Sequence, residues 1–141
     1  MKWYGLALQS MLEGKINWMA NNIKVMLTTS SYTPDQDTHQ YKSDVTNEIT
    51  GAGYTTGGKT LANKSITYTA GTNVLKLDAD DLEWTSATIT ARTLVVYSDV
   101  TGADTVKPLL GYHAFDTDKA TDGASFIVAW DAGGILKLTA S

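Results

Sequence analysis

The residues Gly53 to Thr60 read GYTTGGKT and match the phosphate-binding pattern G-x-x-x-x-G-K-[ST] at every position. In such a loop, glycines let backbone N–H groups turn toward phosphates, the lysine reaches the outer phosphates and the hydroxyl holds magnesium. That chemistry requires a buried parallel strand before the loop and a helix after it. Here a threonine-rich, strand-like segment begins a few residues after Lys59, and VTNEIT before the loop lacks an aliphatic run. We therefore expect a glycine loop with positive φ at Gly57 or Gly58, leading into a strand, and no nucleotide site.

Asp35, Asp37 and His39 alternate as the first ligands of a calcium loop do. The rest of the pattern fails, because Gln40 stands where glycine is required and Thr46 where a bidentate glutamate is required. The alternative is a solvated turn after a proline, in which aspartates accept hydrogen bonds from their own backbone. The turn is favoured, and no metal site is predicted.

Catalytic chemistry has little support in the remaining residues. His113 lies in a strand-like segment, where an imidazole more often packs than catalyses. The chain has no G-x-S-x-G elbow, and its three glutamates form no recognisable acid–base pair. Trp84 and Trp130, at strand ends, could stack on sugar rings or close a core, and the core is favoured. We predict no enzyme, no catalytic residue and no cofactor.

The elements that would position these residues are one helix and many short strands. Apolar residues recur at helical spacing between about Lys2 and Glu13, and Gly14 follows as a stop signal. The apolar stripe of this helix must lie on the chain's own sheet or on a neighbouring subunit, and the chain's own core is favoured. Trp3 and Trp18, near the two ends of the stripe, could anchor it.

Strand patterns cover most of the remaining chain. The sequence predicts strands over Ile23–Thr28, on both sides of a turn at Ala70–Asn73, over Thr88–Asp99, and in PLLGYHAFD, SFIVAW and GILKLTA. The run LVVY indicates a strand buried on both faces, and TGADTVK, TDKATDGA and DAGG are expected turns. The stretch from Thr29 to Val45 is a long polar loop of the kind that often forms interfaces. We predict one all-β domain over residues 1–141, an antiparallel β-sandwich or jelly-roll-like fold with a short N-terminal helix. The helical segment 1–20 could serve as an interface arm.

Composition restricts the partners of the chain. Hydrophobic residues make up 43% of it and charged residues only 18%, so that threonine, serine, asparagine and glycine must supply much of the polar surface. The formal net charge is −4, and the 11 basic residues form no stripe, which argues against nucleic acid. The absence of cysteine fits folding in a reducing cytosol. Gln9, Ser10 and Glu13 interrupt the first apolar run, so neither a signal peptide nor membrane attachment is expected.

Four short segments, within a likeness that extends over nearly the whole chain, are together fairly specific. They are an Ile-Lys-Val strand, the loop SYTPDQDTH, the stretch GAGYTTGG, and TITAR before a hydrophobic strand. In these the chain resembles a family of small proteins encoded in the structural modules of tailed bacteriophages and prophages.

The resemblance implies a virion component assembled in the host bacterial cytoplasm, with no catalytic residues to carry over. A head decoration (cement) protein on the outer capsid surface is the leading expectation. A minor tail or neck component, or a carbohydrate- or receptor-binding module, are the alternatives. The expected partners are the major capsid protein or a tail protein, together with further copies of the chain, for example in a trimer. The expected interface lies in the N-terminal segment and the long loop, where a single sandwich can leave aromatic side chains uncovered: Trp3, Tyr4, Tyr32, Pro34, His39 and Tyr41.

Overall fold

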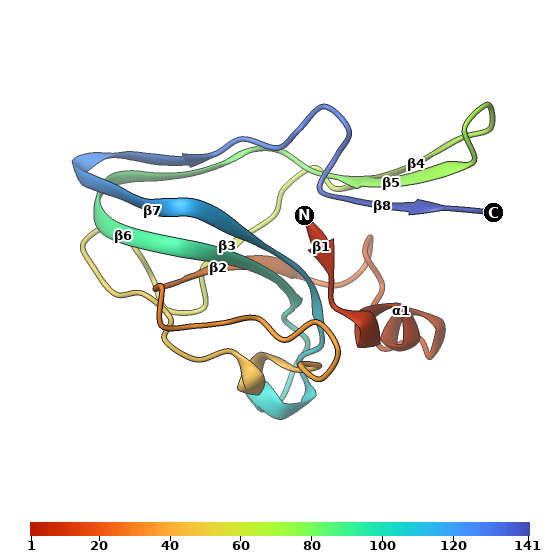
Figure 1. Cartoon of the computed structure of the whole chain (residues 1–141), viewed down its shortest axis with the longest axis horizontal. Helices are drawn as coiled ribbons and strands as arrows, with labels where there is room; N and C mark the ends of the chain where they lie inside the picture. Colours follow the sequence, from red (N-terminus) through yellow and green to blue (C-terminus); the bar gives the residue numbers. More distant parts are fainter.

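The computed structural model describes all 141 residues as two antiparallel sheets and one α-helix (Figure 1). The helices and strands, in chain order, are β1 (Lys2–Trp3), α1 (Gly5–Leu12), β2 (Ile23–Thr28), η1 (Lys42–Asp44), β3 (Lys59–Thr60), β4 (Ser65–Thr69), β5 (Val74–Asp78), β6 (Leu82–Ser98), η2 (Asp104–Val106), β7 (Leu109–Val128) and β8 (Leu136–Thr139). The five-stranded sheet has the order β1-β7-β6-β2-β3, and the three-stranded sheet has the order β4-β5-β8. The prediction of an all-β, antiparallel, sandwich-like fold with a short N-terminal helix is confirmed.

Most strands lie where the alternation of side chains places them. β2 covers the predicted residues, and β4 and β5 form the predicted hairpin, with Thr69 opposite Val74 next to the turn. The LVVY run is buried on both faces of its sheet. Leu94 and Val96 belong to a large core of 20 buried residues, whereas Val95 and Tyr97 belong to a second core of eight on the other side.

The long hairpin of β6 and β7 is the main departure from the predicted layout. The segment TDKATDGA was expected to be a turn, and this is wrong, because β7 runs without interruption from Leu109 to Val128. β6 supplies a paired partner along the way, for example Ala91 opposite Lys119. Register shifts in this stretch let the hairpin bend, and it curls back on itself at the left of Figure 1. Both layers of the sandwich therefore contain parts of the same two strands.

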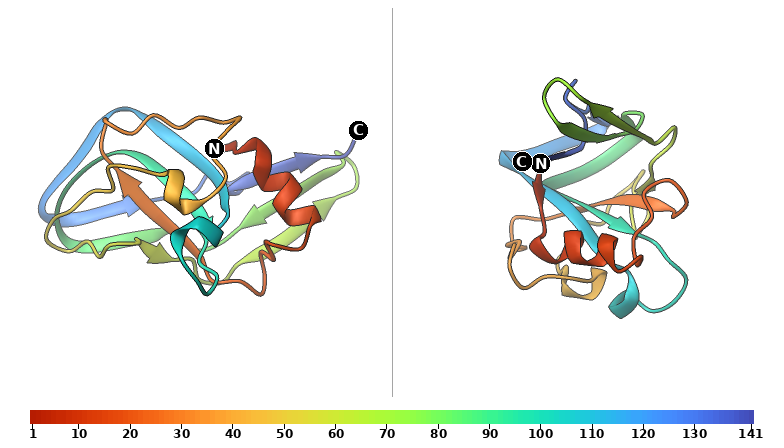
Figure 2. Two further views of the ribbon diagram at one scale, coloured as in Figure 1. Left: turned by 90° about the horizontal axis from the view of Figure 1, so that it is seen from below. Right: turned by 90° about the vertical axis from the view of Figure 1, so that its right-hand side faces the viewer.

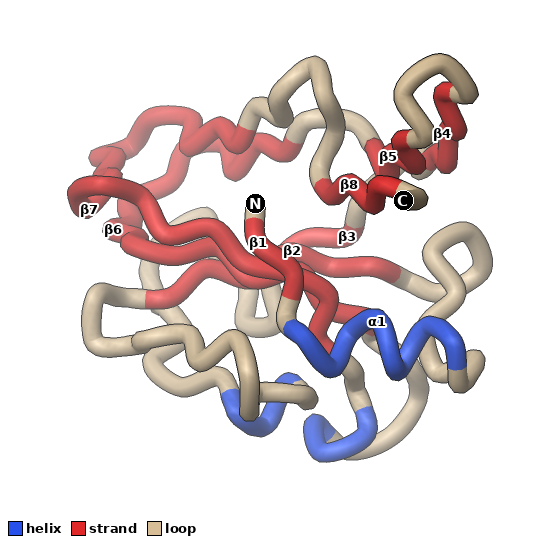
Figure 3. Tube along the Cα trace, turned by 45° about the vertical axis from the view of Figure 1, so that its right-hand side comes forward, coloured by secondary structure: helices blue, strands red, loops and turns tan.

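The N-terminal segment is part of the domain. α1 begins later than predicted, because Lys2 and Trp3 pair with Tyr112 and Gly111 of β7 before the helix starts. Its buried side is set against the chain's own sheet, with Ala7 only 1% exposed, as favoured from the sequence. Figure 2 and Figure 3 show α1 beside the end of the five-stranded sheet. No helix in the structure is both long and apolar enough to cross a bilayer.

Candidate functional site

The glycine loop that resembles a phosphate site continues directly into β3. Gly57 and Gly58 have φ of 90° and 75°, as the sequence predicts. A side chain at Gly58 would overlap the carbonyl oxygen of Val25, so the loop backbone lies directly against β2. Lys59 then pairs with Val25, and its ammonium donates to the carbonyl of Glu83. The expectation of a glycine loop leading into a strand is confirmed, and the helix that a phosphate loop requires is replaced by β3.

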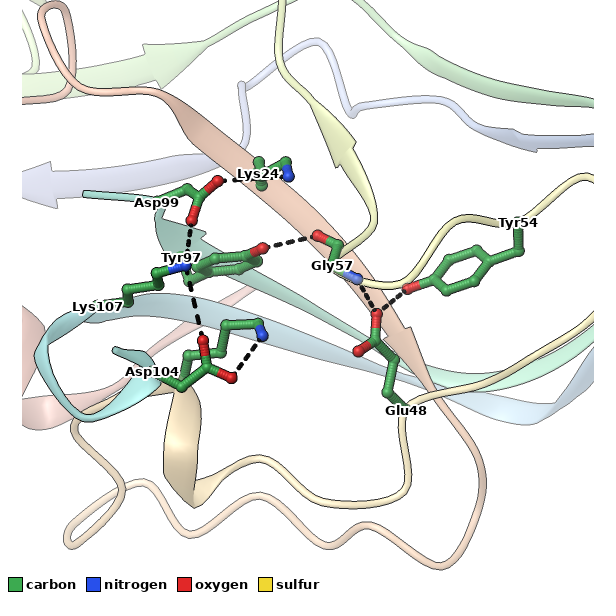
Figure 4. Close-up of polar contacts among 9 residues, drawn as sticks. Lys24, Glu48, Tyr54, Gly57, Tyr97, Asp99, Asp104 and Lys107 are labelled. Atoms are coloured by element: carbon green, nitrogen blue, oxygen red, sulfur yellow. Dashed lines mark hydrogen bonds and ion pairs between the residues drawn. The ribbon is translucent and has the colours of Figure 1, made fainter. Parts of the chain in front are cut away.

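A carboxylate of the chain already occupies the inside of this loop (Figure 4). Glu48 Oε1 accepts the backbone N–H of Gly57 at 2.6 Å and the hydroxyl of Tyr54 at 2.7 Å. The Tyr54 oxygen in turn accepts the N–H of Leu27 at 3.0 Å, and Tyr97 donates its hydroxyl to the Gly57 carbonyl at 2.7 Å. A backbone N–H that could have faced a phosphate is therefore bonded to Glu48. The arrangement fixes the loop to β2 and β6.

Three lysines and two aspartates form a chain of ion pairs next to the loop (Figure 4). Asp99 contacts Lys107 at 2.7 Å and Lys24 at 3.3 Å, and Asp104 contacts Lys42 at 2.8 Å. Burial raises the pKa of Asp99, but the hydrogen bonds from Lys107 and Lys24 outweigh it and hold that pKa below its usual value. The hydrogen bond from Lys42 lowers the pKa of Asp104. These ion pairs fasten the β6–β7 connection to β2 and η1.

Two of the expected interface aromatics are buried inside the chain. Tyr4 is 0% exposed and Tyr32 is 4% exposed, and their hydroxyl oxygens lie 2.8 Å apart. The N–H of Asp35 donates to His39 Nδ1, so this nitrogen is an acceptor, and the Tyr32 hydroxyl donates to it at 3.0 Å. Burial is also the main cause of a raised pKa at Tyr4. The expectation that Tyr4 and Tyr32 lie uncovered is wrong, because β1, α1 and the long loop enclose them in the second core.

The other four expected interface residues, Trp3, Pro34, His39 and Tyr41, are partly exposed. The indole N–H of Trp3 donates to the carbonyl of Lys137 in β8 at 2.8 Å. These four residues keep the surface access that a partner needs, and their role in an interface stays a prediction.

The acidic loop adopts the turn favoured from the sequence. Asp35 Oδ1 accepts the backbone N–H groups of Asp37 and Thr38 at 3.0 and 3.1 Å. Hydrogen bonds from Thr38 and from the Asp37 backbone lower the pKa of Asp35. The Asp35 carboxylate therefore acts as a turn acceptor.

The two tryptophans proposed for sugar stacking have different surroundings. Trp84 is 3% exposed and packs in the large core against Phe126 and Tyr54, which confirms the core assignment. Trp130 is partly exposed and held in place, because its backbone N–H donates to Asp81 and its indole N–H to the Asp80 carbonyl.

Trp130 borders a hollow of about 500 Å³ on the β7 side of the sandwich. Phe115 comes from the first half of β7 and Ile127 from the second, so the bend of this strand encloses the hollow. Ile127 is 62% exposed. His113 also lines the hollow, and burial, followed by the charge of the N-terminal amino group, lowers its pKa. The lining of the hollow thus combines apolar and aromatic side chains with a few polar ones, which suits contact with an apolar side chain or a ring.

Sequence reasoning missed Glu48 and Ile127. A carboxylate shortly before a glycine-rich stretch is the only sequence signal for the role of Glu48, and it does not identify which N–H the carboxylate accepts. Ile127 belongs to the continuous apolar run FIVAW, and such a run does not reveal which of its side chains face outward. Comparisons of the chain with protein-family models, with curated proteins and with solved structures find no match.

Proposed function

We propose that the chain is a structural protein of a tailed-phage virion, a head decoration protein that binds the outer surface of the capsid. The phage-like segments in the sequence support this role, and they fall on an antiparallel sandwich of the kind that suits a shell component. The major capsid protein is the proposed partner, and further copies of the chain assemble with it.

The observation that carries the proposal is the hollow beside β7. Exposed Ile127 lies at a largely apolar recess next to Phe115 and Trp130. A recess that exposes an isoleucine beside aromatic side chains offers an apolar anchor for a side chain of a partner. We therefore assign the capsid contact to this hollow.

Deletion of the N-terminal segment does not test the assignment cleanly. Residues 1–12 contain Tyr4 and Ala7, which fill the second core together with Val95 and Tyr97. Their removal would expose that core, and lost binding would then follow from unfolding. Point substitutions at exposed positions avoid this problem.

The test uses purified chain and heads of the encoding phage or prophage that lack it. Wild-type chain should co-sediment with the heads, and Ile127→Asp should weaken binding roughly tenfold or more, because it puts a charge into an apolar contact. Val106→Asp is the matched control, since Val106 is also exposed (48%) but lies in η2, and it should bind like wild type. Failure of the wild type to bind heads, or equal binding by Ile127→Asp, would contradict the proposal.

Images of intact particles decide between head and tail. Copies over the capsid lattice support the decoration role. Copies confined to the neck or tail would replace it with the minor tail alternative.

Carbohydrate binding is a second candidate, favoured by the position of Trp130 in the hollow. Polar side chains of Lys119, Ser125 and Asp131 line the same hollow and could bond sugar hydroxyls. A glycan array with wild type and Trp130→Ala tests it. Binding that the substitution abolishes would support a sugar site, and an array without any signal would remove the candidate.

A further inference from the structure

The outer strand of the three-stranded sheet, β4, is exposed along its whole length. All five of its side chains are exposed, including Ile66 at 46% and Tyr68 at 55%. These two lie on the same face as their cross-strand partners, Leu77 and Leu75, and only Leu77 lies deep in the large core. The apolar face of this sheet therefore extends beyond the core that it covers.

The backbone groups that β4 leaves unpaired can be identified from its neighbours. In an antiparallel strand, the N–H and C=O of one residue point to the same side, and successive residues alternate. On the β8 side, the N–H of Ile135 donates to the Leu77 carbonyl and that of Ala140 to the Asn73 carbonyl. Odd-numbered residues of β5 thus face β8, and even-numbered ones face β4. The register then directs the backbone N–H and C=O groups of Ser65, Thr67 and Thr69 toward β5, and those of Ile66 and Tyr68 outward.

The other long edges of the molecule carry devices that discourage strand pairing, whereas the only such contact on β4 is at its first residue, where the Trp18 indole donates to the Ser65 carbonyl. The open edge of β7 carries four charged side chains between 116 and 122, and Trp3 bonds to the edge of β8 at Lys137. β4 has the sequence SITYT, with no charge, no proline and no bulge. An edge of this kind is a template for another strand.

We propose that β4 pairs with β4 of a second copy of this chain around a two-fold axis, so that two three-stranded sheets join into one of six strands. This inference deepens the assembly role proposed above by naming the contact between copies. A two-fold contact gives a dimer where the resemblance suggested a trimer.

The sequence of β4 selects the register with the axis at Thr67. In this register Ile66 lies opposite Tyr68 of the second copy, so the outward backbone groups of both residues exchange hydrogen bonds on each side of the axis. Side chains also match, since β-branched with aromatic and threonine with threonine are favourable cross-strand pairs. A register centred on Ile66 would set Lys64 opposite Tyr68 and lose this match.

Charges do not oppose the pairing. Lys76 lies opposite Thr67 on the outer face of the sheet, and two threonines would separate it from Lys76 of the second copy. Three strand spacings amount to about 14 Å, which is beyond the screening length of roughly 8 to 10 Å near physiological salt. The contact is small compared with a standard interface, so we expect a dissociation constant of roughly 10 to 100 μM.

The experiment places a charged side chain at the axis, in place of Thr67. Thr67→Lys and Thr67→Glu should each be monomeric in sedimentation equilibrium at concentrations where the wild type is dimeric, because like charges meet at the axis. An equimolar mixture should recover dimer, since lysine then faces glutamate. Thr139→Lys is the matched control, because Thr139 is an exposed threonine of the same sheet on β8, and it should dimerise like wild type. The thermal midpoint of each variant establishes that it is folded.

A proline substitution tests the same edge through the backbone. The N–H of Ile66 faces outward, so Ile66→Pro should keep the β4–β5 ladder and abolish dimerisation. A wild type that stays monomeric up to about 1 mM, single Thr67 variants that dimerise like wild type, or a mixture that stays monomeric would each overturn the inference. The sedimentation measurements use the purified chain without virions, so they test the dimer separately from head binding. A wild-type chain that stays monomeric refutes the dimer, whereas a wild-type chain that does not bind heads refutes the decoration role.

Discussion

Replacement of Glu48 should loosen the glycine loop by an amount that the contacts of its carboxylate allow us to calculate. Glu48→Ala removes the acceptor for the Gly57 N–H and for the Tyr54 hydroxyl. Each hydrogen bond to a charged group contributes about 1.5 to 3 kcal/mol. Glu48 is partly exposed, so water can replace part of the hydrogen bonding that the carboxylate provides. We therefore expect Glu48→Ala to lower the free energy of unfolding by about 3 kcal/mol.

Substitution by glutamine separates charge from shape. Glu48→Gln keeps an acceptor oxygen of similar reach, so it should lose only about 1 kcal/mol. In a double-mutant cycle with Tyr54→Phe, the coupling energy between residues 48 and 54 should be about 1 to 2 kcal/mol, because the two groups share one hydrogen bond.

Urea unfolding at pH 7 measures these free energies, and amide hydrogen exchange at Gly57 reports the loop directly. Asp116→Ala is the control, since that exposed carboxylate makes no hydrogen bond or ion pair in the structure, and it should change stability by less than about 0.5 kcal/mol. The reasoning is refuted if Glu48→Ala is as stable as this control. It is refuted equally if Glu48→Gln loses as much as Glu48→Ala while exchange at Gly57 stays slow.

Three further predictions concern single positions. Asp99→Asn should lose about 1 kcal/mol at pH 7. Because the pKa of Asp99 is lowered in the folded protein, the extra stability of the wild type should decline as the pH falls below the usual aspartate pKa near 3.8. Urea unfolding at several pH values between 7 and 2.5 measures this decline. Gly58→Ala should cost about 3 kcal/mol, because φ is positive and the methyl overlaps β2, whereas Gly71→Ala, with open space around it, should be nearly neutral in the same assay. Trp84→Ala should cost about 4 kcal/mol by opening a core cavity, and clearly more than Trp130→Ala in thermal unfolding; equal costs would contradict the core assignment of Trp84.

Local patterns were sufficient to predict the elements whose own residues alternate clearly or flank a clear turn. β2 and the β4–β5 hairpin follow from alternation and from turn residues at 70–73. The segment at 117–124 was mispredicted, because aspartate, glycine and threonine favour turns locally, while the ladder to β6 and the bend of the hairpin decide its structure. No local signal indicates that β6 remains the partner of β7 over that distance.

The candidate sites were less predictable than the strands, because each depends on contacts between distant segments. Tyr32 stands in a polar stretch and Tyr4 follows Trp3 at the start of the first apolar run, and only the fold brings the two together in the second core. The Glu48 contact requires the glycine loop to turn back toward the bridge between Glu48 and Thr28. The free edge of β4 follows from the order of the sheet, which composition and alternation do not determine.

The LVVY run has a consequence for how the molecule melts. Its alternate side chains fill the large core on one side and the second core on the other, so the two cores share one stretch of backbone. Separation of either layer would strip half of this stretch of its packing and weaken the hydrogen-bonded ladder that holds the other half. Although the chain has two cores, they should therefore be lost together, in a single cooperative transition.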